Sequence, residues 1–283
     1  MYMGTFNSFF SRKLVRTLAA ADYSEPIFSD EYSKLLIDMG CNTVGEGMAA
    51  LYSFLFKCHR NEYVYKNELF NKIILGIHSP RTSTAFEEMP VANSKADFVV
   101  LNGSAMVYEV KTDLDNLQRL DAQIADYYSA FDKVTVVCGL KTMEALVGRY
   151  GDSPIGILQF TPRGTLHWCK KPDVVREGLS SMTLFNLLRK AERDAVLEEL
   201  GVGTPNELPA CYARAAYDLF SAIPMSRLYP KCLEVIKRRG SNVDARAIRC
   251  LPRELKLPGY FARITDKQVV RVLERLSYPL LGC

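Results

Sequence analysis

Residues Asp97 to Lys111 read DFVVLNGSAMVYEVK, and most of the functional information in the chain lies here and in the residues that follow. Two apolar runs, 98–101 and 105–108, are rich in β-branched and aromatic residues and flank Asn102-Gly103. Asn-Gly between two such runs is a strong short-range signal for a β-hairpin. The stretch therefore predicts two antiparallel strands, with an acid at one end and a Glu-Val-Lys sequence at the other.

The register of this hairpin decides which side chains meet. Side chains alternate between the two faces of a strand, so Glu109 and Lys111 share one face. A hairpin centred on Gly103 places Asp97 opposite Glu109 on that face. A strict two-residue Asn-Gly turn would instead pair Asp97 with Tyr108 and put the two acids on opposite faces. A shared acidic site therefore requires a three-residue loop or a bulge.

The three polar residues of the hairpin suit one kind of chemistry. Two carboxylates held close together raise each other's pKa unless a cation lies between them. Carboxylate oxygens suit Mg²⁺, which binds through one or two carboxylates and keeps several waters. A nearby lysine could orient or deprotonate a water, or neutralise charge on a scissile phosphate. Asp97, Glu109 and Lys111 thus supply what a hydrolytic phosphodiesterase needs.

A known pattern has the same residues at the same spacing. Asp97, eleven residues and Glu109-Val110-Lys111 resemble the signature of the PD-(D/E)xK nuclease superfamily, with Ala96 at the usual proline position. Residues 61–137 are more closely similar to an uncharacterised bacterial family of this type. The similar pieces are Glu62-Tyr63, Lys66-Asn67, Glu88, Lys95-Ala96-Asp97, residues 108–111, Leu117, Arg119-Leu120, Gln123 and residues 131–134. The resemblance covers the second quarter of the chain well and implies a restriction-endonuclease-like mixed sheet flanked by helices.

The resemblance also implies a set of metal ligands. Asp97 and Glu109 would bind Mg²⁺ or Mn²⁺, with Lys111 as the third catalytic residue. A further acid would come either from Glu62, at the start of a predicted helix over 61–76, or from Glu88, on the strand before Asp97. An acid in the first turn of a helix also complements the helix dipole, which is the structural alternative for Glu62.

A helix is predicted to follow the hairpin, capped by Asp113 and running to about residue 130. Its apolar stripe contains Leu114, Leu117, Leu120, Ile124 and Tyr128. Gln123 and Tyr127 lie on an adjacent stripe with Arg119 and resemble the QxxxY element that positions DNA in some of these nucleases. The alternative is a Gln–Tyr pair that packs the helix onto the sheet. Lys95, on the same face as Asp97, is a further candidate for positioning nucleic acid.

The rest of the chain predicts an α/β class with three parts: an N-terminal helical layer over 1–60, a nuclease-like core over 61–170 and an all-helical C-terminal domain over 171–283. Helices are predicted over 5–20, 30–39, 46–58, 142–149, 181–200, 206–222, 224–239, 244–251 and 265–277. Further strands are predicted over 133–138, 155–160 and 165–169. A hydrophobic content of 48% with 24% charged residues argues against disorder.

Charge is unevenly distributed along the chain. Residues 1–170 hold 17 Lys and Arg against 19 Asp and Glu, whereas residues 171–283 hold 19 against 13. A basic helical half is compatible with nucleic-acid binding, and a solvated helical surface explains it equally. The run Lys237-Arg238-Arg239 is likewise either a phosphate-contacting patch or a set of cations that complement a helix C-terminus.

Cysteine and hydropathy patterns bear on the environment of the protein. The eight cysteines form no CxxC motif and predict reduced thiols, and three histidines make a zinc site unexpected. No signal pattern or apolar run of membrane-span length is present. We expect a cytoplasmic protein of bacterial or phage origin without a membrane partner. A protein partner or a homodimer stays open.

The leading hypothesis is a metal-dependent nuclease, with DNA preferred over RNA by the habit of the resembling superfamily. The first alternative is a non-catalytic module that binds nucleic acid or protein on a nuclease-derived fold, since fold does not establish function. The second alternative is a structural salt-bridge cluster at the end of a sheet, formed by Asp97, Glu109 and Lys111.

Overall fold

The computed structural model describes residues 9–22, 26–206, 208–240 and 242–280. Its contacts divide the chain into a helical unit, Met1–Arg81 with Asn242–Cys283, and a sheet unit, Thr82–Ser241. This division differs from the predicted boundaries after residues 60 and 170. It differs because the helices that follow residue 170 share a core with the sheet, while the last helices pack with the N-terminal ones.

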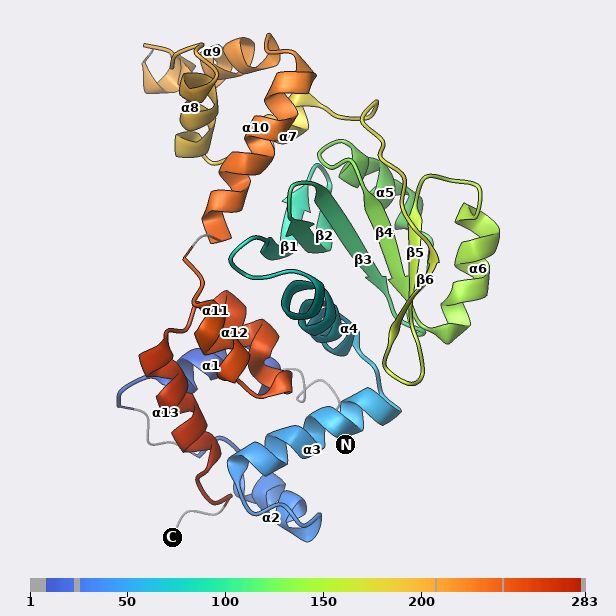
Figure 1. The fold of residues 1–283 in the computed structure, drawn as a ribbon, viewed down its shortest axis with the longest axis vertical. Coiled ribbons are helices and arrows are strands. Elements are labelled where there is room, and N and C mark those ends of the chain that lie inside the picture. The colour runs from blue at the N-terminus through green and yellow to red at the C-terminus, as the bar shows by residue number, and fades with distance from the viewer. Residues whose placement is uncertain (1–8, 23–25, 207, 241, 281–283) are drawn as a thin grey trace. The chain divides into compact units, whose positions relative to one another are not determined.

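The sheet unit contains one six-stranded mixed sheet in the order β1-β2-β3-β4-β5-β6 (Figure 1). The strands are β1 (Thr84–Val91), β2 (Ser94–Leu101), β3 (Ala105–Lys111), β4 (Val134–Cys138), β5 (Gly156–Phe160) and β6 (Leu166–Lys170). The first three strands are antiparallel, β3, β4 and β5 are parallel, and β6 is antiparallel to β5. The predicted α/β class is confirmed.

The loop between β2 and β3 has three residues rather than two. Leu101 pairs with Ala105, so residues 102–104 form the loop, and Asn102 N donates to the Ser104 carbonyl at 3.0 Å. Gly103 lies in this loop with φ +70°, a left-handed conformation that favours glycine. The pairing continues to Phe98 with Tyr108, which leaves Asp97 at the level of Glu109. The register therefore meets the condition for a shared acidic site.

Helix α5 (Leu120–Tyr128) packs on β2 and β4, and helix α6 (Leu140–Tyr150) packs on β5. The prediction that α5 begins near Asp113 is wrong. Asp115 Oδ2 accepts hydrogen bonds from both the amide and the hydroxyl of Thr112 at 2.7 Å, and such local bonds compete with helix formation. Leu114, predicted in the apolar stripe, is 75% exposed. Asp113 Oδ1 instead accepts from Lys141 N at 3.0 Å, in the first turn of α6.

Four further helices complete the sheet unit (Figure 1). They are α7 (Ser181–Leu187), α8 (Lys190–Glu199), α9 (Pro209–Ser221) and α10 (Met225–Lys237), followed by the 3₁₀ turn η3 (Arg238–Gly240). The single helix predicted over 181–200 is two helices, because Arg189 N bonds Glu192 Oε2 at 2.7 Å and begins a new helix. Leu184, Val196, Phe220 and Val235 from these helices belong to one buried cluster with sheet residues such as Val107 and Val136.

The helical unit contains most of the remaining predicted helices. Its elements are α1 (Arg12–Ala19), α2 (Asp30–Asp38), α3 (Val44–Cys58), α4 (Glu62–Leu69), the π-helix η2 (Phe70–Ile77), α11 (Ala245–Cys250), the 3₁₀ turn η4 (Arg253–Leu255), α12 (Lys256–Ala262) and α13 (Asp266–Leu276). Side chains of Ser11, Ser29, Thr43 and Asn61 cap the first four helices. Helix α12 was not predicted, because Pro258 and Gly259 interrupt the pattern. Phe6, assigned to the first predicted helix, lies outside the described residues.

Two other sequence-based expectations concern the whole chain. The seven cysteines in the described part of the chain are free thiols, while Cys283 lies outside it. Among the described residues, no helix combines the length and the apolar character that crossing a membrane requires.

Candidate functional site

The ends of β2 and β3 bring Asp97, Glu109 and Lys111 together. Val110 N donates to Asp97 Oδ2 at 2.7 Å, so the backbone of β3 holds the aspartate. Lys111 Nζ donates to Glu109 Oε1 at 2.7 Å. The Glu109 side chain is only 1% exposed, and a buried carboxylate requires such partners to offset the cost of leaving water. Lys111 and Glu109 thus form an ion pair, and Asp97 is bonded to the backbone amide of the residue between them.

Helix α5 adds Gln123 and Tyr127 to this group. Lys111 Nζ donates to Gln123 Oε1 at 3.0 Å, so the ammonium is held between Gln123 and Glu109. Tyr127 Oη lies 2.6 Å from Glu109 Oε2 and 2.9 Å from the carbonyl oxygen of Lys95. Gln123 Nε2 lies 3.5 Å from Tyr127 Oη. The two helix residues therefore bond Glu109 and Lys111 directly.

The burial of Tyr127 defines its role at the site. Its side chain is fully buried, so it contacts the acids and the strand rather than any molecule in solution. Burial, followed by the charges of Glu109 and Asp97, raises the pKa of Tyr127 well above its ordinary range. The phenol therefore stays protonated and acts as a hydrogen-bond donor to Glu109.

Glu88 and Lys95 lie on the two strands that flank the turn at residues 92–93. The β1–β2 pairing runs from Thr84 to Val91 with a gap at Glu88, which lies at the level of Asp97. Glu88 has φ +53°, a left-handed conformation that costs free energy for a residue with a Cβ. One of its carboxylate oxygens lies within 4.8 Å of one from Asp97. Lys95 Nζ lies 2.8 Å from Glu88 Oε2.

Arg119 and Glu62 are the other two predicted site residues. Arg119 is exposed at the start of α5. Glu62 belongs to the helical unit, where it forms an ion pair with Lys66 in the first turns of α4. Its role as a metal ligand stays a prediction.

The basic run at the end of α10 is engaged with carboxylates. Arg238 donates to Glu199 at 2.5 and 2.8 Å and to Glu234 at 2.6 Å. Arg239 Nε donates to Glu192 Oε1 at 2.6 Å. These pairs join α10 to α8 and support a structural role for the run.

One member of the site, the backbone amide of Val110, cannot be recognised from residue types. Its hydrogen bond to Asp97 depends on the pairing register of the hairpin and not on the identity of residue 110. Only the length of the loop could have indicated it, since a three-residue loop brings the end of β3 level with Asp97.

Asp97 and Glu88 lie close enough to share a hard divalent cation, because a carboxylate oxygen of one lies within 4.8 Å of a carboxylate oxygen of the other. Asp97, Glu109 and Glu88 offer carboxylate oxygens, which are the ligands that Mg²⁺ and Mn²⁺ prefer. Each oxygen of an ionised carboxylate accepts at two lone-pair positions, so the single bond that Lys111 or Tyr127 makes to each Glu109 oxygen leaves acceptor capacity. Lys111 lies beside Glu109, where its positive charge could also interact with an anionic group bound at the site.

Comparison with known proteins identifies the family. Residues 57–255 match the family described as Bacteriophage P4 protein cII, and the chain belongs to this family. The chain is also similar to Protein cII of Enterobacteria phage P4, with 32% identity over 133 residues, which cover 44% of this chain and 49% of the relative. The chain therefore spans about half the length of the curated relative it matches. No solved structure matches the chain significantly. The matched family region contains all the residues of the site in the sheet unit.

Proposed function

We propose that this protein is a metal-dependent nuclease with a restriction-endonuclease-like core. The observation that carries the proposal is the register of the β2–β3 hairpin, which brings Asp97 level with Glu109 and places Lys111 on the Glu109 carboxylate. The mixed six-stranded sheet with helices beside it supports the fold assignment.

Asp97, Glu109 and Glu88 would hold Mg²⁺ or Mn²⁺. When bound, the ion would lower the pKa of a coordinated water and stabilise negative charge on the phosphate in the transition state. Tyr127 holds one oxygen of Glu109, and Val110 N holds one oxygen of Asp97. These two donors keep the carboxylates in place before any substrate arrives.

Lys111 would act on the substrate side of the site. Its ammonium is held at 2.7 Å from Glu109 and 3.0 Å from Gln123, so its position is fixed by two acceptors. From there it can orient the attacking water or neutralise charge on the scissile phosphate. Gln123 and Tyr127 would accordingly act through Lys111 and Glu109, while exposed Lys95 and Arg119 remain candidates for nucleic-acid contact.

The test is incubation with single-stranded DNA, duplex DNA and RNA, with and without Mg²⁺ or Mn²⁺. We expect metal-dependent cleavage, of DNA in preference to RNA. Lys111→Ala should slow it by about 10²- to 10⁴-fold, the usual contribution of a residue that assists proton transfer. Binding without cleavage of any of the three polymers would instead favour a non-catalytic nucleic-acid-binding module. If the protein neither binds nor cleaves any of the three polymers, the result would favour a structural salt-bridge cluster.

A further inference from the structure

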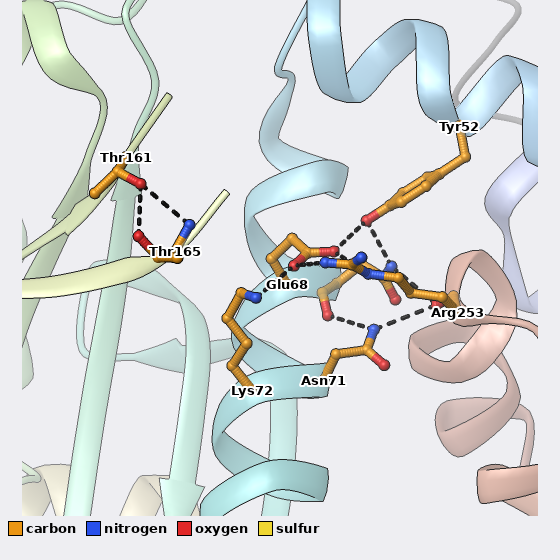
Figure 2. A network of polar contacts seen from close by, with 8 residues as sticks. Tyr52, Glu68, Asn71, Lys72, Thr161, Thr165 and Arg253 are labelled. Atoms are coloured by element: carbon orange, nitrogen blue, oxygen red, sulfur yellow. Dashed lines mark hydrogen bonds and ion pairs between the residues drawn. The ribbon is translucent and has the colours of Figure 1, made fainter. Parts of the chain in front are cut away.

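A second polar group lies in the helical unit, around the side chain of Glu68 (Figure 2). Glu68 is fully buried. Its Oε1 accepts from the Tyr52 hydroxyl and from Arg253 Nε, both at 2.9 Å. Its Oε2 lies 2.5 Å from Arg253 Nη2 and 3.3 Å from Lys72 Nζ. One buried carboxylate thus anchors two cations from different parts of the chain.

The backbone around Arg253 is held by two asparagines. Asn67 and Asn71 donate from their side chains to the Arg253 carbonyl, at 3.1 and 3.3 Å. Asn67 Oδ1 accepts from Leu257 N at 3.3 Å. These bonds fix η4 and the start of α12 on α4 and η2, so the cations of these elements keep a defined position.

Around Arg253, positively charged side chains outnumber carboxylates. Arg253 bonds Glu68 and yet its side chain remains 51% exposed. Arg249 on α11 is exposed and Lys256 on α12 is half-buried. Burial, followed by the charges of Arg249 and Arg253, lowers the pKa of Lys256. The charges of Arg249 and Arg253 that act on Lys256 are the part of this effect that would attract an anion.

The charge of the whole helical unit agrees with this local surplus. Counted from the sequence, residues 1–81 and 242–283 hold 17 Lys and Arg against 12 Asp and Glu. Residues 82–241 hold 19 against 20. The basic surplus of the chain therefore belongs to the helical unit and not to the unit that carries the acidic site.

We propose that Lys72, Arg249, Arg253 and Lys256, called the Arg253 cluster below, form a site for the phosphate backbone of a nucleic acid. Guanidinium groups pair with phosphate oxygens through two parallel hydrogen bonds, and lysines add point charges. Several cations spread over four elements suit a repeating polyanion better than a single small anion. The choice of ligand rests on the proposed nuclease function, for which this cluster would bind the substrate.

The test measures the affinity of the full chain for fluorescent duplex DNA, in EDTA to prevent cleavage, over a range of salt concentrations. Each phosphate contact contributes about −0.9 to the slope of log K against log salt concentration. The double variant Arg249→Gln/Lys256→Gln leaves the bonds of Glu68 untouched and should make the slope shallower by about 1.8. The control variant Lys34→Gln/Lys267→Gln removes two exposed cations from α2 and α13 of the same unit and should leave the slope unchanged.

Three results would overturn the proposal. The cluster variant could keep the wild-type slope, or the control variant could lose as much slope as the cluster variant. Alternatively, the cluster variant could lose binding to phosphatidylserine vesicles while keeping wild-type binding to DNA. Circular dichroism and the thermal midpoint confirm that both variants fold.

The same preparations separate this proposal from the nuclease proposal. DNA binding through the cluster without metal-dependent cleavage would contradict the nuclease function and leave the cluster site standing. Metal-dependent cleavage with an unchanged salt slope in the cluster variant would do the reverse.

Discussion

At the scale of the residue, the site depends on the partners that hold one buried carboxylate in place. Glu109 is buried with Lys111 on one oxygen and Tyr127 on the other. Removing one partner of such a group leaves a buried charge or donor without compensation, which costs more than the bond itself contributes. A residue that holds Glu109 in place should therefore be detectable through the affinity of the site for a metal ion.

Replacing Tyr127 with Phe tests this directly. The ring still fills its buried place, but Glu109 loses its hydroxyl donor. Loss of a partner that orients a metal ligand typically weakens metal binding by about 10- to 100-fold, and we expect that loss for Mn²⁺ measured by calorimetry. The matched control is Tyr150→Phe, which removes a tyrosine–carboxylate bond to Asp121 away from the site. Equal Mn²⁺ affinity in wild type and Tyr127→Phe would contradict the positioning role.

Glu88 offers a test of strain. Its φ of +53° is costly for any residue with a Cβ, so Glu88→Gly should be more stable than Glu88→Ala by about 1 kcal/mol. Both variants lose the carboxylate, and both should bind Mn²⁺ more weakly than wild type. Urea denaturation compares the two stabilities. If the Glu88→Ala and Glu88→Gly variants are equally stable, residue 88 does not adopt the left-handed conformation in the folded protein.

Among the residues of the site, the sequence indicated the types but not the bonds. Asp97, Glu109 and Lys111 stand out because alternation along a strand fixes which side chains share a face. Gln123 and Tyr127 stand out by their spacing on a helix, yet that spacing says nothing about whether a tyrosine points to solvent or to a buried acid. The direction of Tyr127 depends on how α5 packs on β2 and β4, which is a tertiary property.

At the scale of the element, the three-residue loop of the hairpin sets the register. Gly103 adopts φ +70° with open space around it, so Gly103→Ala strains the backbone without a clash and should destabilise by about 1 kcal/mol. Gly148 lies inside α6, also with open space, and Gly148→Ala should stabilise by about 0.5–1 kcal/mol. Urea unfolding of both variants checks the pair. Effects of the same sign would contradict the assigned loop conformation.

Elements were predicted well where the pattern was regular. The strands and most helices follow from apolar periodicity and N-caps. The exceptions have two physical causes. Local side-chain hydrogen bonds change where a helix begins, and a proline interrupts the apolar periodicity. Thr112 and Asp115 delay α5, Glu192 begins a new helix at Arg189, and Pro258 conceals α12.

At the scale of the whole molecule, the chain crosses between its two units. The division could not be read from composition, because α7 to α10 share one buried core with the sheet although they follow it in sequence. Thr84 Oγ1 on β1 donates to the Lys237 carbonyl at 3.0 Å, and Tyr229 Oη on α10 accepts from Asp132 N at 3.0 Å. These contacts hold the last long helix of the unit against the sheet.

Gly240 lies where η3 meets β1, and it tests that packing. A Cβ at this position would lie 2.2 Å from Thr84 Cγ2, so backbone or strand must move to admit it. Gly240→Ala should destabilise the protein by roughly 1–3 kcal/mol, the usual cost of overpacking. Urea unfolding measures the change, with Gly148→Ala as the substitution that meets open space. A neutral Gly240→Ala would show that η3 does not pack on β1.

If Asp97 and Glu109 share one divalent ion, as we propose, a Mn²⁺ binding isotherm will detect it. We expect wild type to bind one ion in the sheet unit, and Asp97→Asn and Glu109→Gln each to abolish that binding. Glu144→Gln, which removes an exposed acid from α6, should bind as wild type does. Wild-type affinity in either Asp97→Asn or Glu109→Gln, or no Mn²⁺ binding by the wild type, would contradict the account.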